Sequence, residues 1–217
     1  MSDNIFCSGT LIATYHVLTA EQCFENIGND PIQIILSTGD LTHGTHTFPL
    51  WWISYDMWAH HSRSQITTIY NNIAIIKIFG VTPSLRIAPL STISPLRLLE
   101  GFRAELCGCS VRNANANPIM MQKAEVRILK RETCAHIVSE LEGVELVFPD
   151  NYICTNANPV VHLENKDKGG PVLFFDSLIA INVGTFPCME GAYNVNKVNG
   201  HITVDHYRVF IYDMLNY

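Results

Sequence analysis

The chain has 217 residues, a formal net charge of −6 and a hydrophobic content of 47%. This length suits one large domain or two small barrels that share an interface, and the composition is that of a globular protein. The acidic balance argues against a nucleic-acid or anionic-membrane partner, and no apolar run is long enough to span a bilayer. We therefore expect neither nucleic acid nor membrane as a partner.

The N-terminal segment shows no sign of a signal peptide. Asp3 stands where such a segment carries positive charge, and Ser8 and Gly9 interrupt the apolar stretch. Seven cysteines are many for a cytosolic protein of this size, and they indicate an oxidising compartment. Because the number is odd, at least one thiol has no partner within the chain.

Short β-branched runs bounded by Gly, Pro or Asn follow one another along the chain and predict strands. They lie at residues 31–39, 72–79, 104–111, 124–129, 170–175 and 177–184. Many short strands at regular spacing predict an all-β sandwich or barrel. Residues 87–101, with their prolines, serines and weak periodicity, are the candidate linker. We expect one barrel in residues 1–92 and a second in residues 93–217.

The last segment of the chain has a helical pattern instead. Its apolar positions fall on one face of a helix: Val204, Tyr207, Ile211, Met214 and Leu215. We expect a C-terminal helix that docks on a barrel. The aromatic run at residues 50–58 is expected to supply barrel core and packing between the barrels.

Histidines occur in two groups that could suggest a metal: His43 with His46, and His60 with His61. No Cys or carboxylate spacing completes a tetrahedral zinc site around them. Asp40 is the one carboxylate in this region, whereas calcium needs several oxygen ligands. We expect no metal and no cofactor.

Several segments, in order, resemble the trypsin-like (chymotrypsin-fold) serine proteases. Residues 6–23, FCSGTLIATYHVLTAEQC, resemble the family's Cys-Gly-Gly-Ser-Leu-Ile and Val-Leu-Thr-Ala-Ala-His-Cys. Further matches are NNIAIIKI (71–78), ETCAHI (132–137) with NYICTN (151–156), KDKGGPVLF (166–174) and HYRVFIYDML (206–215). The resemblance covers nearly the whole chain. It implies two six-stranded antiparallel β-barrels with a C-terminal helix, the first barrel being incomplete because little chain precedes Cys7.

The resemblance also implies how the cysteines pair. Two family disulfides would be Cys7–Cys23 and Cys134–Cys154. Glu164 stands where the family partner of Cys188 would be, so Cys188 loses that bridge. Two more cysteines lie on one predicted strand, Cys107 and Cys109. A bridge from Cys188 to this pair stays open, as do buried free thiols.

The family needs His as general base, Asp to orient it and Ser as nucleophile. The matching positions here are Gln22, Asn72 and Lys168. A Gln amide has no basic nitrogen near neutral pH, and a neutral Asn cannot stabilise an imidazolium. Lys168 could attack only with a strongly lowered pKa, and no base remains to help it. The resemblance therefore implies a protease fold without protease chemistry.

The surroundings of these positions depart from the family too. Lys166 and Lys168 stand where backbone N–H groups build the oxyanion hole, and Lys166 replaces its Gly. His162 occupies the base of the specificity pocket, where trypsins keep Asp, so a cation-selecting pocket is not indicated. Asp167 matches the residue that pairs with a free N-terminal ammonium in active members. Packing or solvent exposure is the expected role of His162.

Three function classes follow. The first is a secreted, catalytically inactive homologue that binds a protein and acts as cofactor, decoy or regulator in an extracellular protease pathway of immune or reproductive fluid. Its partner would be an active serine protease, a zymogen or an inhibitor. The second class is a hydrolase with a non-standard catalytic group. The third is a carrier of a small ligand or metal in the vestigial cleft. Family analogy favours the first class.

Overall fold

A computed structural model describes residues 7–25, 31–37, 39–64, 70–80, 85–109, 120–187 and 194–217. The strands within these ranges are β1 (Thr10–Ala13), β2 (His16–Thr19), β3 (Ile34–Leu36), β4 (Thr45–Thr47), β5 (Pro49–Ser54), β6 (Ala74–Ile78), β7 (Arg103–Gly108), β8 (Gln122–Ile128), β9 (Tyr152–Asn156), β10 (Pro171–Phe174), β11 (Ser177–Phe186) and β12 (Val198–Thr203). The α-helices are α1 (Tyr55–Ser62), α2 (Pro95–Leu98), α3 (Arg131–Glu142) and α4 (Arg208–Leu215). Short 3₁₀ helices are η1 (Glu21–Phe24), η2 (Leu41–His43), η3 (Asn165–Asp167) and η4 (Asp205–Tyr207). None of the helices in these ranges has the length and apolar character to cross a membrane.

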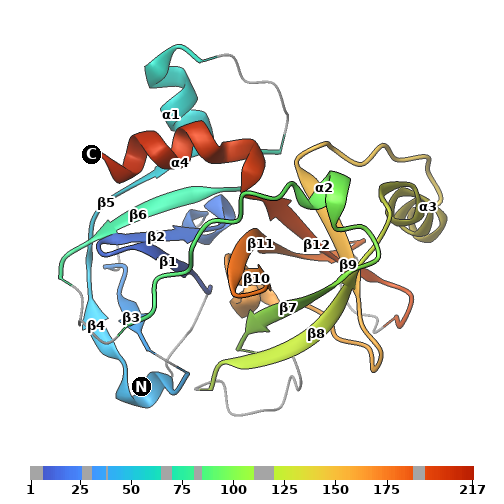
Figure 1. Ribbon diagram of the computed structural model, residues 1–217, viewed down its shortest axis with the longest axis horizontal. Coiled ribbons are helices and arrows are strands. Elements are labelled where there is room, and N and C mark those ends of the chain that lie inside the picture. Colours follow the sequence, from blue (N-terminus) through green and yellow to red (C-terminus); the bar gives the residue numbers. More distant parts are fainter. Residues whose placement is uncertain are drawn as a thin grey trace.

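The second half of the chain closes into a barrel of strands in the order β10-β11-β12-β9-β8-β7 (Figure 1). All neighbouring strands in it are antiparallel. In β8, Ala124, Val126 and Ile128 are buried, and the residues between them are exposed. This alternation places one face of the strand in the core and the other in water, as a barrel wall requires.

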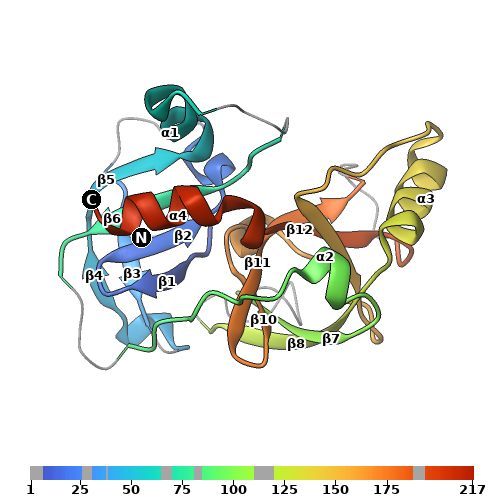
Figure 2. The ribbon, with the colours of Figure 1, turned by 45° about the horizontal axis from the view of Figure 1, so that its top comes forward.

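The first half is less closed. A four-stranded sheet runs in the order β1-β2-β6-β5, and β3 pairs with β4 in a separate two-stranded sheet (Figure 2). Strand β6 is central, because it pairs with β2 on one side and β5 on the other. The expectation of an all-β fold with two barrels is confirmed. Within the described residues, the strands of the first barrel do not close into a ring.

The C-terminal helix forms where the apolar pattern predicts it. It begins as η4 and continues as α4, and in both views it lies across the first half, beside β6 (Figures 1 and 2). Four residues of the predicted face are buried: Val204, Tyr207, Ile211 and Met214. Phe210 is fully buried as well and joins the same core. The helix therefore belongs to the core between the two halves.

The aromatic run at residues 50–58 supplies this core, as expected, but half of it is helical. After β5, Ser54 caps α1 by accepting a hydrogen bond from the Met57 N–H at 3.3 Å. Tyr55 and Trp58 then turn inward, and Tyr55 meets Tyr207 edge to face with ring centroids 4.9 Å apart. Aromatic residues favour strands in general, so the sequence pattern hid this helix.

The predicted linker between the halves is held to both of them. The Ala88 N–H donates to the Leu11 carbonyl of β1 at 2.9 Å. The Leu178 N–H of β11 donates to the Pro89 carbonyl at 2.8 Å. The short helix α2 follows before β7 begins. The linker thus connects the edge of the first sheet to the second barrel.

Candidate functional site

Gln22 joins the two halves of the molecule. It lies in η1, directly after β2. Its backbone N–H donates to Asn72 Oδ1 at 2.9 Å, and its side-chain Nε2 donates to the Val183 carbonyl of β11 at 2.6 Å. The side chain at the position of a general base is therefore a hydrogen-bond donor to the opposite half.

Asn72 is positioned by its neighbour Asn71. The Asn71 side chain donates to Asp56 Oδ1 at 2.7 Å and accepts from the Tyr207 hydroxyl at 2.9 Å. Tyr207 in turn accepts from Asn151 at 2.6 Å. This largely buried network joins α1, the segment before β6, the residue before β9, and η4, so it fixes the chain at Asn72 between the halves.

Lys168 directly follows the 3₁₀ turn η3. Its backbone N–H donates to the Asn165 carbonyl at 3.2 Å. One residue earlier, Asp167 is completely buried, and its Oδ2 accepts the Glu164 N–H at 2.9 Å. The amide that would serve an oxyanion at residue 168 is therefore engaged within the turn.

Ser8 fastens this turn to the first half. Its N–H donates to the Lys168 carbonyl at 2.7 Å, and its Oγ donates to the Lys166 carbonyl at 2.8 Å. The Lys168 carbonyl also lies 3.8 Å from Cys23 Sγ, next to Gln22. The structure thus brings the positions of Gln22, Asn72 and Lys168 to one junction between the halves.

The region around His162 is held together by hydrogen bonds from a residue that the sequence pattern did not single out. Asn199, on β12, accepts the Leu163 N–H at 2.9 Å and donates to the Val161 carbonyl at 2.8 Å. Thr185 on β11 donates to the Leu163 carbonyl at 2.9 Å. His162 itself is half-buried, and burial lowers its pKa. The walls beside the expected pocket base are therefore tied together by a buried amide.

A buried polar chain lies beneath the turn. The Thr155 hydroxyl lies 2.8 Å from His201 Nε2, and His201 Nδ1 lies 3.0 Å from Asn182 Oδ1. Asn182 donates from Nδ2 to the carbonyls of Cys107 and Asp167 at 3.0 and 3.1 Å. Since its oxygen must then accept, Nδ1 of His201 carries the proton. Complete burial lowers the pKa of His201 to about 3, so this ring is neutral.

No single-residue signal in the sequence marks Asn199 or His201. Both lie within a strand that looks like an ordinary barrel strand, and their partners come from β9, β11 and the segment before η3. Their roles arise from contacts between segments far apart in the chain. Sequence reasoning could have found them only by pairing β12 correctly with its neighbours.

The disulfides Cys7–Cys23 and Cys134–Cys154 are present, with Cα separations of 5.9 and 6.0 Å. Cys107 and Cys109 are buried free thiols, which is one of the two alternatives that the sequence left open. Burial raises the pKa of Cys107 to about 11, so it stays a thiol. Cys188 itself lies outside the described residues.

The histidines of the metal hypothesis lie apart from this junction. His43 Nδ1 lies 2.9 Å from Asp40 Oδ2 on an exposed turn. His60 and His61 end α1. Across the described ranges, no three or more His, Cys, Asp or Glu side chains are placed to hold a metal ion.

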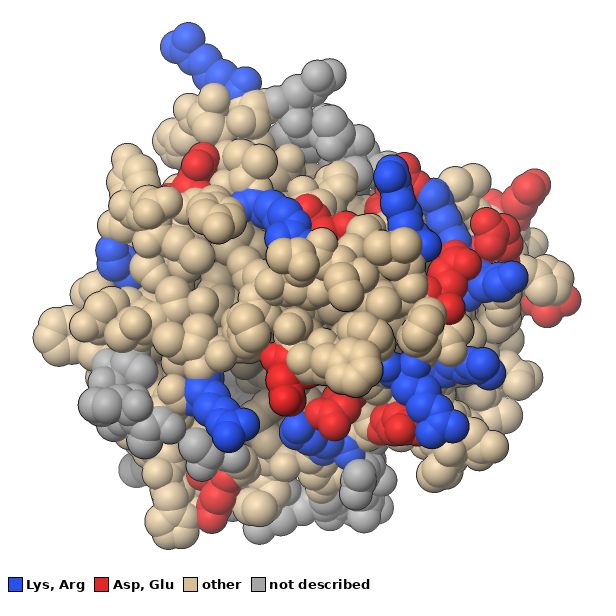
Figure 3. Space-filling view, viewed as in Figure 1, with Lys and Arg blue, Asp and Glu red and all other residues tan. Residues whose placement is uncertain are grey.

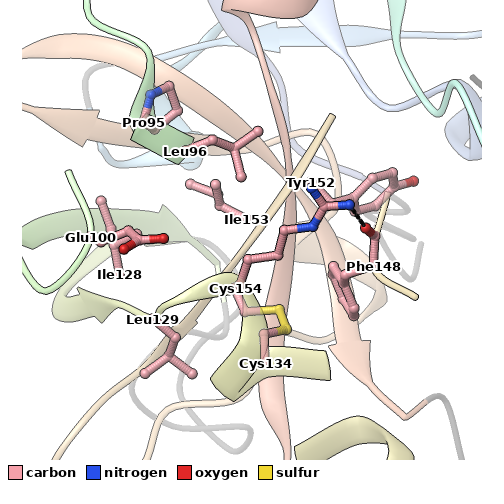
Figure 4. Close-up of a pocket in the computed structure, with 11 residues that line it drawn as sticks. Pro95, Leu96, Glu100, Ile128, Leu129, Cys134, Phe148, Tyr152, Ile153 and Cys154 are labelled. Atoms are coloured by element: carbon pink, nitrogen blue, oxygen red, sulfur yellow. Dashed lines mark hydrogen bonds between the residues drawn. A yellow bond between two sulfur atoms is a disulfide. The ribbon is translucent and has the colours of Figure 1, made fainter. Parts of the chain in front are cut away.

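Two hollows lie elsewhere on the second half. One, of about 10 Å³, lies beside the Cys134–Cys154 disulfide and is lined by Ile128, Phe148 and Tyr152 among others (Figure 4). It has room for a single water at most. The other, of about 330 Å³, lies open between residues 90–93 and the β10–β11 turn. Neither is lined by Gln22, Asn72 or Lys168.

Comparison with known proteins agrees with the fold. The model of the Trypsin family matches residues 1–211. Trypsin delta and trypsin gamma of Drosophila melanogaster are each 23% identical over 192 residues, which span 86% of this chain and 71% of the relative. Protein masquerade of the same fly is 25% identical over 181 residues, 78% of this chain and 17% of that protein.

Among solved structures, neuropsin, a serine protease expressed in the limbic system of mouse brain, superposes with a TM-score of 0.73. The match is 15% identical and covers 97% of this chain and 89% of that one, which shows a shared fold. The family model spans almost the whole chain. The chain therefore belongs to the trypsin family.

Proposed function

We propose that this trypsin-family chain has no peptidase activity and works by binding another protein in an extracellular protease pathway. The observation that carries the proposal is the junction of Gln22, Asn72 and Lys168. Where a base should accept a proton, the Gln22 amide donates to Val183 at 2.6 Å. An amide has no basic nitrogen, so neither a hydroxyl nor a lysine at residue 168 is activated.

Two further observations support inactivity. The Lys168 N–H donates to Asn165 within its own turn, so it does not point into an oxyanion hole. The completely buried carboxylate of Asp167 accepts the Glu164 N–H and thereby belongs to the same turn. Restoring three side chains would leave both arrangements in place.

The protein-binding role rests on what the chain keeps. It retains the family fold and two disulfides, which fit a secreted protein. It also exposes large apolar side chains on the first half, including Tyr15, Phe48 and Phe79. An active serine protease, a zymogen or an inhibitor is the partner class that the family suggests.

The test uses the native protein and the triple variant Gln22→His, Asn72→Asp and Lys168→Ser. Each is incubated with a serine-directed fluorophosphonate and with a panel of chromogenic peptide esters, beside an active trypsin as control. We expect neither labelling nor turnover from either sample, because triad residues act as one unit and the supporting turn is altered. Turnover by the native protein would overturn the proposal. Turnover by the triple variant alone would show that only the three side chains had been lost.

A further inference from the structure

The open hollow of the second half has one wall that is fixed by backbone hydrogen bonds. The hollow has a volume of about 330 Å³ and lies between residues 90–93 and the β10–β11 turn. Residues 89–91 run along the start of β11. The Leu178 N–H donates to the Pro89 carbonyl at 2.8 Å, and the Ser91 N–H donates to the Leu178 carbonyl at 2.9 Å. A ligand that enters the hollow therefore meets a wall that is already ordered, which lowers the entropic cost of binding.

The opposite wall displays an aromatic residue in an unfavourable backbone conformation. Phe174 pairs with Ser177, so Phe175 and Asp176 form a two-residue turn, with φ values of +47° and +59°. Such turns favour Asn and Gly, because a bulky side chain is strained in the left-handed region. Phe175 is nevertheless 88% exposed, so burial within the chain does not offset this strain. An exposed aromatic residue at a strained position indicates a role in binding.

The Phe175 ring belongs to a chain of three aromatic rings in contact. Its centroid lies 4.6 Å from that of Phe174, and the Phe174 centroid lies 6.1 Å from that of Phe102, both pairs being edge to face. Phe102 is more than half exposed. Leu90 and Ile93 add apolar surface on the other side of the hollow. The hollow is therefore a groove with aromatic and aliphatic walls that opens to solvent.

Among the described residues, none that lines the hollow is charged. Two charged residues lie nearby. Arg208 hydrogen-bonds the Ser91 carbonyl. The raised pKa of Lys123, on β8, is due mainly to its hydrogen bond with Glu105, with a smaller contribution from Asp176, so the charge of Asp176 acts toward β8. A charged side chain in the hollow would lose water without gaining a counter-ion from the lining, so the lining favours an uncharged ligand.

Hydroxyl groups supply the polar part of the lining. Ser91 Oγ accepts the Ile93 N–H at 3.1 Å, whereas the hydroxyls of Thr92 and Ser177 form no hydrogen bond with the described residues. These two hydroxyls can donate to carbonyl groups of a ligand. The backbone of Ser91 is not available to pair with an added β-strand, because its N–H and its carbonyl are both engaged. The hollow thus suits a ligand whose carbonyls lack partners.

We propose that this hollow binds a proline-rich segment of a partner polypeptide, in the polyproline II conformation, with its proline rings against Phe174 and Phe175. The carbonyls of the segment accept from Thr92 and Ser177. A polyproline II segment has no internal hydrogen bonds and loses little entropy on binding, and aromatic-lined grooves are its usual receptors. An α-helix satisfies its own carbonyls, so it would leave both hydroxyls unused. The inference rests on the proposed function in one respect, since it takes the chain to bind a protein.

The test measures the binding of fluorescein-labelled decapeptides, blocked at both ends, to the full chain by fluorescence anisotropy. The probes are deca-proline, an alternating Gly-Ser peptide and an alternating Val-Thr peptide. We expect deca-proline to bind about tenfold more tightly than either of the other two. Two central Lys or two central Glu residues in deca-proline should weaken binding to a similar extent, because the lining carries no charge.

Phe175→Asn separates binding from stability. Asn tolerates the left-handed conformation, so this variant should melt at the native temperature or above, while its preference for deca-proline disappears. Thr92→Val should weaken deca-proline binding about threefold, because one donor is lost. Val147→Asn is the matched control. Val147 is 85% exposed and follows α3, which lies apart from the β10–β11 turn in both views (Figures 1 and 2), so its replacement should leave binding unchanged.

The proposal fails if the native chain shows no preference for deca-proline, or if the Val-Thr peptide binds as tightly. A preference that survives Phe175→Asn, or that Val147→Asn abolishes equally, would overturn the site. Sedimentation of the chain without peptide is measured as well. A dimer that Phe175→Asn dissociates would assign the hollow to a second copy of the chain and would also overturn the proposal. Ester hydrolysis is followed in the same samples: turnover would refute the proposed function, whereas a missing proline preference without turnover would refute this inference alone.

Discussion

In the first half of the molecule, the cluster between the sheets has four buried members, Val17, Leu36, Ile76 and Ile78, and their apolar neighbours stay partly exposed. In the second half, eleven residues are buried together inside the closed barrel. The first half buries its other apolar side chains, such as Leu18 and Ile75, against α4 and the second barrel. Its stability therefore depends on the contact between the halves more than on a core of its own.

The surfaces of the two halves also differ, in the number of charged side chains they carry. On the face shown in Figure 3, charged side chains of both signs gather over the second half, and the first half shows few. On the second half, Arg103 pairs with Glu125 and Lys123 with Glu105, each at 2.7 Å. A poorly charged surface with exposed aromatic residues is typical of a protein-binding face. Exposed aromatic side chains occur on both halves, among them Phe79 and Phe175. The sparsely charged surface of the first half is therefore the feature that fits the proposed binding of a protein.

Acid should destabilise the protein mainly through the second half. His201 is neutral when folded, with a pKa of about 3, whereas an unfolded histidine titrates near 6.5. Between these values the unfolded chain binds one more proton, so stability falls as the pH is lowered from 6.5 to 3. The loss is at most about 5 kcal/mol over this range. Urea unfolding at several pH values measures it.

His16 is the matched histidine of the first half. It is buried on β2, and burial lowers its pKa too. His201→Gln should flatten the dependence of the unfolding free energy on pH far more than His16→Gln does. If both substitutions flatten it equally, the buried polar chain of the second barrel has no special role in acid sensitivity.

Adjacent residues of β6 compare the two cores directly. Ile75 is fully buried in the shared cluster, and Ile76 faces the cluster of the first half with 6% exposure. Ile75→Ala should lower the unfolding free energy toward the upper end of about 2–5 kcal/mol, and Ile76→Ala toward the lower end. The neighbours of Ile76 are partly exposed, so they can move or let water fill the space. Equal losses in chemical denaturation would mean that the first half has an independent core.

Local periodicity in the sequence predicts β3, β6, β7, β8, β10, β11 and the C-terminal helix, and the motif resemblance supplies the three junction positions. The sequence pattern does not mark β4, β9 or β12 as strands. It does not predict α1 and α3. In α1, the aromatic residues Tyr55 and Trp58 favour a strand, and tertiary packing overrides that preference. Asn199 and His201 were also missed, since their hydrogen bonds join strands that meet only in the folded barrel. Local sequence patterns predict secondary-structure elements, whereas the polar contacts between elements can be identified only once the tertiary fold is known.

One added carbon atom in the turn that carries Lys168 should weaken the contact between the halves. Gly169 and Gly101 have almost the same φ, +80° and +79°. A Cβ on Gly169 would lie 2.2 Å from Thr19 Oγ1 and 2.4 Å from the Ser8 carbonyl oxygen, whereas one on Gly101 meets nothing within 4 Å.

Both alanine substitutions carry the strain of a left-handed conformation, about 1 kcal/mol. Gly169→Ala should cost roughly 1–3 kcal/mol more, because Ser8 and Thr19 of the first half must move away from the turn. Thermal unfolding of the two variants measures the difference, and native-state hydrogen exchange should show faster exchange in β1 and β2 for Gly169→Ala alone. Equal melting temperatures would show that the halves tolerate separation at this point, and that the turn does not depend on the first half for its position.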